Sequence, residues 1–186
     1  MDTITKTWIT AAQLLEDSYR LANAIDASGF VPTHIVGIWR GGAPVGIAVQ
    51  ELLEYRGIAT DHIAIRTRSY TGIDQAADTV RVYSLGYLVD TLAPDDRVVV
   101  VDDVFDTGRS IAAVSHELHA RCGHNTPREI RIATVYWKPH RNQTALRPDW
   151  YIHQTDEWLV FPHEICGLTE AEIRAHKPQA GLILRD

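Results

Sequence analysis

Apolar residues near the start of the chain recur at helical spacing and predict an amphipathic helix. They are Leu14, Leu15, Leu21, Ala22 and Ile25. Residues at this spacing share one face of a helix, which can then pack on a core. Thr10 followed by Gln13 fits a capping box, in which both side chains hydrogen-bond to backbone N–H groups at a helix start. We therefore expect a helix from about Thr10 to Ser28–Gly29.

Short apolar runs further along the chain predict strands that alternate with helices. Strands are expected at 33–39, 62–67, 97–101 and 129–137, and an extended segment at 81–88. Helices are expected at 43–55, 110–121 and 169–176. This alternation is typical of βαβ units and predicts an α/β fold with a mainly parallel sheet flanked by helices. In such sheets ligands bind beyond the carboxyl ends of the strands.

Length and composition predict one globular domain covering residues 1–186, with 45% hydrophobic and 23% charged residues. No apolar run approaches the roughly 20 residues that cross a bilayer, and the N-terminus lacks the pattern of a signal peptide. We therefore expect a cytoplasmic protein without membrane contact. Cys122 and Cys166 have no metal-ligand spacing. The net charge of −6 argues against nucleic-acid binding, which usually requires a basic surface.

The segment VVVVDDVFDTGRSI, residues 98–111, joins a buried strand to a helix through a turn suited to an anion. The first N–H groups of a helix have no partner within the helix, so they bind phosphate well. Gly108 allows the backbone to approach such a ligand closely. Thr107 and Ser110 add hydroxyl donors, and Arg109 adds positive charge. These four residues predict a site for a phosphate group.

Three acids precede this turn, and their chemistry complements a phosphorylated sugar. Asp102 and Asp103 can accept hydrogen bonds from vicinal hydroxyl groups, or hold Mg²⁺ directly or through water. Asp106, close to the turn, can transfer a proton. Together with residues 107–110, these acids predict a site for a ribose 5-phosphate.

Residues 98–111 resemble the motif with which type I phosphoribosyltransferases bind phosphoribosyl diphosphate (PRPP). In that motif, four apolar residues and two acids are followed by an Asp-Thr-Gly turn. The resemblance implies the type I phosphoribosyltransferase fold: a mainly parallel, twisted sheet flanked by helices, a mobile hood loop and a C-terminal base-binding segment. It also implies PRPP as a substrate and Mg²⁺ as the cofactor, held in part by Asp102 and Asp103.

Two earlier segments are similar to further elements of this family. Residues 38–44, IWRGGAP, resemble the turn that binds the diphosphate, here through Arg40, Gly41 and Gly42, and the resemblance implies a cis peptide between Trp39 and Arg40. The polar residues 67–80 are expected to form the hood loop. Within it, Ser69 and Tyr70 resemble the start of the loop that closes over the reacting centre.

The segment from about 136 to 165 resembles the base pocket of the 6-oxopurine enzymes, which act on hypoxanthine, guanine or xanthine. The resemblance implies that Lys138 contacts the ring oxygen O6, because an ammonium group only donates hydrogen bonds and so favours an oxo group over an amino group. It further implies that Trp158 stacks on the purine and that the main chain of Leu159 reads the ring edge. Glu164 matches an acid that helps to hold Mg²⁺.

The resemblance therefore implies purine salvage: a 6-oxopurine and PRPP give a nucleoside monophosphate and diphosphate, and Asp106 takes the proton of the purine N7. Relatives in the family imply a homodimer or homotetramer. Two alternatives stay open. One is a phosphoribosyltransferase for another base, adenine or orotate, and the other is a PRPP-sensing regulatory protein of the same fold. The preferred 6-oxopurine also stays open.

Overall fold

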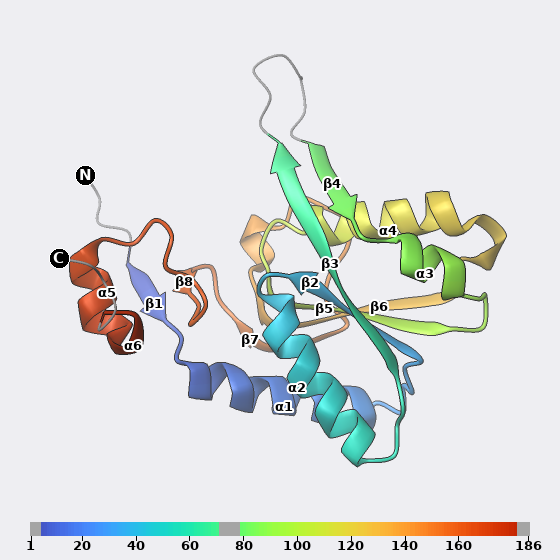
Figure 1. The fold of residues 1–186 in the computed structure, drawn as a ribbon, viewed down its shortest axis with the longest axis horizontal. Coiled ribbons are helices and arrows are strands. Elements are labelled where there is room, and N and C mark those ends of the chain that lie inside the picture. Colours follow the sequence, from blue (N-terminus) through green and yellow to red (C-terminus); the bar gives the residue numbers. More distant parts are fainter. Residues whose placement is uncertain (1–4, 71–78, 182–186) are drawn as a thin grey trace. The chain divides into compact units, whose positions relative to one another are not determined.

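A computed structural model describes residues 5–70 and 79–181 (Figure 1). The chain divides into two compact units. The larger comprises residues 15–156, and the smaller combines residues 1–14 with 157–186. Helix α1 (Ala11–Ala27) begins where predicted. The Thr10 N–H donates to Gln13 Oε1 at 2.9 Å, and the Gln13 N–H donates to Thr10 Oγ1 at 3.1 Å, which confirms the capping box.

The larger unit contains a six-stranded sheet with the strand order β4-β3-β2-β5-β6-β7. All neighbouring pairs are parallel except β3 and β4, which are antiparallel. This arrangement confirms the predicted α/β fold. The strands are β2 (His34–Trp39), β3 (Asp61–Tyr70), β4 (Thr79–Tyr83), β5 (Arg97–Phe105), β6 (Glu129–Trp137) and β7 (Trp150–Gln154).

Helices cover both faces of this sheet (Figure 1). Helix α2 (Gly42–Tyr55) lies on one face, and α3 (Gly86–Thr91) and α4 (Arg109–Cys122) lie on the other. Val98 and Val100 of β5 pack in one buried cluster with Ile111 and Val114 of α4. Because β5 lies in the interior of the sheet and residues 98–101 are buried, it holds the acids near its carboxyl end in a fixed place. In residues 5–70 and 79–181, no helix has the length and hydropathy needed to cross a membrane.

Three local expectations are wrong. Strand β5 does not end at Val101 but continues to Phe105, because Val104 and Phe105 pair with Tyr136 and Trp137 of β6. The expected loop is strand at both ends, since residues 67–70 of β3 pair with residues 79–82 of β4. Residues 71–78 lie outside the described part of the chain. The segment expected to be extended at 81–88 leaves β4 at Tyr83 and enters α3 at Gly86.

The smaller unit joins the two ends of the chain. Strand β1 (Lys6–Trp8) pairs in parallel with β8 (Trp158–Val160). Helices α5 (Glu170–His176) and α6 (Pro178–Gly181) follow, and α5 begins with a capping box between Thr169 and Glu172. The Lys6 ammonium lies 2.5 Å from a Glu172 carboxylate oxygen, and so ties the N-terminal strand to α5.

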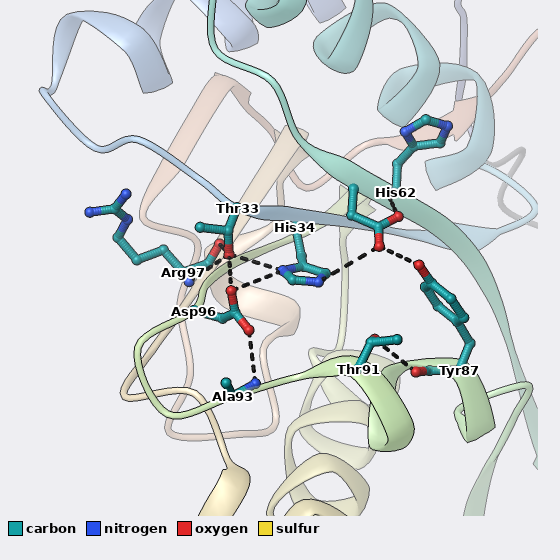
Figure 2. Close-up of polar contacts among 9 residues, drawn as sticks. Thr33, His34, His62, Tyr87, Thr91, Ala93, Asp96 and Arg97 are labelled. Carbon is teal, nitrogen blue, oxygen red and sulfur yellow. Dashed lines mark hydrogen bonds and ion pairs between the residues drawn. The ribbon is translucent and has the colours of Figure 1, made fainter.

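A polar network lies at the amino end of the six-stranded sheet, where β2 and β3 begin and the turn before β5 meets them (Figure 2). The ring nitrogens of His34 lie 3.5 Å from an Asp96 oxygen and 3.9 Å from an Asp61 oxygen. Asp96 also accepts hydrogen bonds from the Thr33 hydroxyl and the Ala93 N–H, each at 2.8 Å. These contacts tie together the starts of three strands.

Candidate active site

The turn between β5 and α4 forms a small hollow at the carboxyl edge of the sheet. Its volume is about 80 Å³, and its polar lining consists of Asp102, Asp106, Thr107, Gly108 and Ser110. Gly108 has a φ of 75°, in the left-handed region that favours glycine. A Cβ at this position would lie 2.6 Å from the Thr144 hydroxyl and 2.7 Å from the Phe105 ring, so only glycine fits.

Helix α4 starts at Arg109, directly beside this hollow, and its N-cap residue Gly108 has no side chain to cap it. The Arg109 N–H makes only a long hydrogen bond, 3.5 Å, to Thr107 Oγ1. The N–H groups of its first turn therefore point at the space where an anion would lie. The structure thus brings the hollow, the start of α4 and the hydroxyl groups of Thr107 and Ser110 together at one turn.

Asp102 and Asp103 lie inside β5, and both are poorly accessible. The Asp103 N–H donates to Asp102 Oδ1 at 3.0 Å. Burial raises the pKa of Asp102 well above its ordinary value of 3.8, and the neighbouring Asp103 carboxylate raises it further. The Gly42 N–H donates to Asp102 and partly opposes this shift. A buried carboxyl group beside a second acid gains most from a ligand that brings donors or positive charge.

The Arg-Gly-Gly turn after β2 packs directly on this pair of acids. A Cβ on Gly41 would overlap the Asp103 carboxylate, and one on Gly42 would overlap the Val101 carbonyl oxygen. Both glycines are therefore required by close approach. The peptide bond between Trp39 and Arg40 is cis, as expected, and the Arg40 side chain is exposed. The structure thus brings the predicted diphosphate turn and the predicted ribose-binding acids to one edge.

Lys138 is only 4% exposed, and its ammonium nitrogen lies 3.3 Å from Asp106 Oδ2. The other Asp106 oxygen accepts a hydrogen bond from Arg141 Nε at 2.5 Å. Arg141 was not among the predicted site residues. Its position in the sequence could have indicated this contact, because Arg141 follows β6 by a few residues and therefore lies at the same sheet edge as Asp106. Two cations thus hold the proposed proton acceptor in position.

The remaining predicted base-binding residues lie in the smaller unit. The Trp158 side chain is 50% exposed, whereas Leu159 is buried. The Glu164 carboxylate accepts a hydrogen bond from the Phe161 N–H at 2.9 Å. Within this unit Trp158 and Glu164, but not Leu159, line a hollow of about 280 Å³, together with Lys6, Val160, Cys166, Gly167 and Leu168.

Ser69 and Tyr70 were expected in a loop, but both belong to β3. Ser69 pairs with Val80 and Tyr70 with Thr79 of β4. The Ser69 side chain is exposed. The arms of a β-hairpin, rather than irregular chain, therefore carry the two residues to which the sequence assigned a role in closure.

Among the described residues, no three His, Cys, Asp or Glu side chains are arranged to hold a metal ion. The adjacent Asp102 and Asp103 still fit Mg²⁺, because Mg²⁺ is usually held by one or two carboxylates together with water and substrate phosphates. A magnesium ion at this edge would complete its coordination with substrate oxygens.

Comparison with known protein families shows the family to which this chain belongs. The sequence profile of the phosphoribosyl transferase domain matches residues 9–166. The chain therefore belongs to the phosphoribosyltransferase family.

Individual proteins that are similar to the chain share 24–35% of their residues with it over the aligned lengths. The chain is 24% identical to a hypoxanthine-guanine phosphoribosyltransferase of Lactococcus lactis over 185 residues, which cover 97% of this chain and 91% of the relative. It is 35% identical over 77 residues to the bifunctional protein PyrR of Macrococcus caseolyticus, covering 41% of this chain and 42% of PyrR. The crystal structure of a purine phosphoribosyltransferase from Pyrococcus horikoshii superimposes with a TM-score of 0.69 at 27% identity, covering 88% and 97% of the two chains.

Proposed function

We propose that this protein transfers the 5-phosphoribosyl group of PRPP to a 6-oxopurine base (hypoxanthine, guanine or xanthine) in purine salvage. The observation that carries the proposal is the buried ammonium group of Lys138, 3.3 Å from Asp106 at the edge where the phosphate turn begins. The relatives from Lactococcus lactis and Pyrococcus horikoshii, whose names give purine substrates, support the same reaction.

Lys138 is assigned to the selection of the base. Its ammonium group has three donors and no acceptor, and one donor is directed at Asp106. The remaining N–H donors of Lys138 favour a ring oxygen such as O6, which accepts hydrogen bonds. The amino group of adenine is itself a donor and cannot accept from Lys138. Burial strengthens this preference, because an unpaired donor is costly where water is excluded. We assign Trp158 to stacking on the purine and the main chain of Leu159 to reading the ring edge.

The 5-phosphate is assigned to the hollow at Thr107–Ser110, where the first amides of α4 and two hydroxyl groups converge. Asp102 and Asp103 are assigned to the ribose hydroxyls and to Mg²⁺, with Glu164 as a further metal ligand. The bound ion would supply positive charge to the diphosphate. Because Asp102 is buried beside Asp103, donors from the substrate relieve a cost that the free protein carries.

In the reaction, a purine ring nitrogen forms a bond to C1 of the ribose while the bond from C1 to the diphosphate breaks. Arg40 and the N–H groups of Gly41 and Gly42 are assigned to the departing negative charge, and such electrostatic help is usually a large contribution to catalysis. Asp106 is assigned to the proton that the purine releases at N7. Its contacts with Lys138 and Arg141 fix the direction from which it receives that proton.

The test is release of diphosphate from PRPP and Mg²⁺ with a panel of bases: hypoxanthine, guanine, xanthine, adenine, orotate and uracil. Turnover confined to one or more 6-oxopurines supports the proposal and ranks the substrates. Turnover with adenine or orotate instead would keep the PRPP site and refute the role of Lys138.

A second candidate is a PRPP-sensing regulatory protein of the same fold. The observation that favours this candidate is the match to the bifunctional protein PyrR, which is 35% identical to the chain over 77 residues. Measurable PRPP binding without turnover of any base would select this candidate.

A further inference from the structure

The backbone of the turn that follows β6 holds Asp106 in place, in addition to the side-chain contacts of this acid. The Lys138 N–H donates to the carbonyl oxygen of Phe105 at 2.9 Å. The Gln143 N–H donates to the carbonyl oxygen of Thr107 at 3.0 Å. These two carbonyl groups flank Asp106 in the sequence, so the position of the acid follows the position of the turn.

Residues 138–143, which we call the β6 turn, also carry Arg141. The Nε of this residue donates to Asp106 Oδ1 at 2.5 Å, although nearly half of the Arg141 side chain is exposed. A long, accessible side chain has many rotamers, and holding it in one of them costs entropy. The contact with Asp106 therefore depends on how firmly the backbone of the β6 turn is held.

Asp156, two residues beyond the end of β7, anchors the β6 turn through a separate set of contacts. One carboxylate oxygen accepts the His140 N–H at 3.2 Å, and the other lies 2.5 Å from Nδ1 of the same residue. A carboxylate only accepts hydrogen bonds, so Nδ1 is the donor. The hydrogen bond from the His140 ring lowers the pKa of Asp156 below its ordinary value of 3.8, so this carboxylate is charged at neutral pH.

We propose that Asp156 is a positioning residue that acts on Asp106 through His140 and Arg141. His140 directly precedes Arg141, so the two bonds from His140 to Asp156 fix the backbone from which the guanidinium reaches Asp106. Without them the guanidinium would leave Asp106 more often, and the acid would lose its orientation. The effect on the rate rests on the proposed function, in which Asp106 accepts a proton, whereas the effect on the turn does not.

Asp149 provides a matched control on the same pair of strands. Its carboxylate accepts the Ile132 N–H at 2.8 Å. Like Asp156, it is an aspartate next to β7 that accepts a backbone N–H, but Ile132 lies near the start of β6 rather than in the turn after it. Asp149→Ala therefore removes a contact of the same kind and leaves the β6 turn untouched.

The first test is steady-state kinetics of Asp156→Ala, Arg141→Ala and the double variant. Both side chains are partly exposed, so the fold should survive each change. Each single change should lower kcat about 10-fold, the scale of a small misplacement, and change the KM for PRPP by about 2-fold at most. Because Asp156 acts through Arg141, the double variant should also lose about 10-fold, whereas independent effects would multiply to about 100-fold.

Two further variants grade the effect on kcat. His140→Ala keeps the backbone bond to Asp156 and should lower kcat less than Asp156→Ala does. Asp149→Ala should leave kcat unchanged. Losses that multiply in the double variant would overturn the proposal, and so would a KM for PRPP that rises as much as kcat falls.

Amide hydrogen exchange of the free chain, followed by NMR, tests the positioning without any turnover. Asp156→Ala should speed exchange of the Gln143 N–H at least about 10-fold, because the β6 turn opens more often, and should leave the Ile132 N–H unchanged. Asp149→Ala should do the reverse. Unchanged exchange at Gln143 in Asp156→Ala would overturn the proposal. Absence of turnover with every base would refute the proposed reaction alone, because the exchange rates do not depend on it.

Discussion

Asp61 and Asp96 at the amino end of the sheet are surrounded by donors, whereas Asp102 at the carboxyl end is enclosed beside another acid. The Tyr87 hydroxyl donates to Asp61, and this bond, with that from the His62 N–H, lowers the pKa of Asp61. At the other end, burial and Asp103 raise the pKa of Asp102. At the amino end donors stabilise the charged form of Asp61, whereas at Asp102 the N–H donors of Gly42 and Asp103 do not outweigh burial and the neighbouring acid.

This difference distinguishes Asp102 from Asp61 by the surroundings of its carboxyl group. Burial beside a like charge makes Asp102 a candidate for binding a ligand that brings donors or positive charge. Asp106 is different, because Lys138 and Arg141 stabilise its charged form, and its proposed role rests on its place beside the phosphate turn. Variants at the two ends of the sheet should therefore differ in their effects on catalysis and on stability.

Asp106→Asn should lower kcat by about 100-fold or more, because it removes the proposed proton acceptor. PRPP binding should be largely kept, since the amides of the phosphate turn are untouched. Steady-state kinetics with the best base, together with calorimetric titration of PRPP, would measure both. Asp96→Asn is the matched control at the amino end and should leave kcat unchanged. An unchanged kcat for Asp106→Asn would remove this residue from the mechanism.

Gly41→Ala should raise the KM for PRPP by about 10-fold or more, because a Cβ there overlaps the Asp103 carboxylate and displaces part of the site. Gly86→Ala is its control, since a Cβ at Gly86 meets no atom within 4 Å. Kinetics at varied PRPP would compare the two variants. Equal KM values would show that the close approach of the turn to Asp103 has no role in binding.

Asp102→Asn should stabilise the free protein at neutral pH while it impairs catalysis. An acid whose pKa is raised by folding lowers stability above that raised pKa. The penalty shrinks as the pH falls through the raised pKa and is absent below the ordinary value of 3.8. Each pKa unit is worth about 1.4 kcal/mol, so Tm should rise by about 3 °C or more at pH 7.5. Thermal denaturation at pH 7.5 and 4.5 checks this, and a gain that grows on acidification would contradict it.

Tyr87→Phe should have the smallest effect, which is present at neutral pH and lost in acid. The Tyr87 hydroxyl lowers the pKa of Asp61, so its contribution is present above the ordinary pKa of 3.8 and is lost as the pH falls through the lowered value. Because both groups are accessible to water, we expect a Tm change of about 2 °C or less at neutral pH. The difference from the natural chain should vanish near pH 2, and a persistent difference there would assign the effect to packing.

The sequence was sufficient for the longer elements α1, β2, α2, β3, β5, α4 and β6, because their apolar patterns are strong. The short elements β1, α3 and α6 were not predicted. The sequence was also sufficient for the two glycine-containing turns because few residue types satisfy a left-handed φ or close backbone contact. It failed at residues 102–105, where charge suggested the end of a strand. The pairing of Val104 with Tyr136 extends β5 through the acids, and such pairing is tertiary information.

Two further features depend on partners distant in sequence. The polar residues 67–70 gave no strand signal, yet they pair with β4, because an edge hairpin needs no apolar face. Arg141 stood in a loop with two prolines nearby and had no motif of its own. Only the approach of the turn after β6 to the turn after β5 brings its guanidinium to Asp106.

The parallel pairing of β1 with β8 has a consequence for the order in which the chain folds during synthesis. It joins residues 6–8 to residues 158–160, so the ribosome releases β1 long before its partner strand exists. All six strands of the central sheet have been made by residue 154. Contacts so distant in sequence form late, because closing a long loop costs entropy. During synthesis β1 therefore remains without its partner strand until β8 has been made, and a chain that ends before residue 158 lacks that partner altogether.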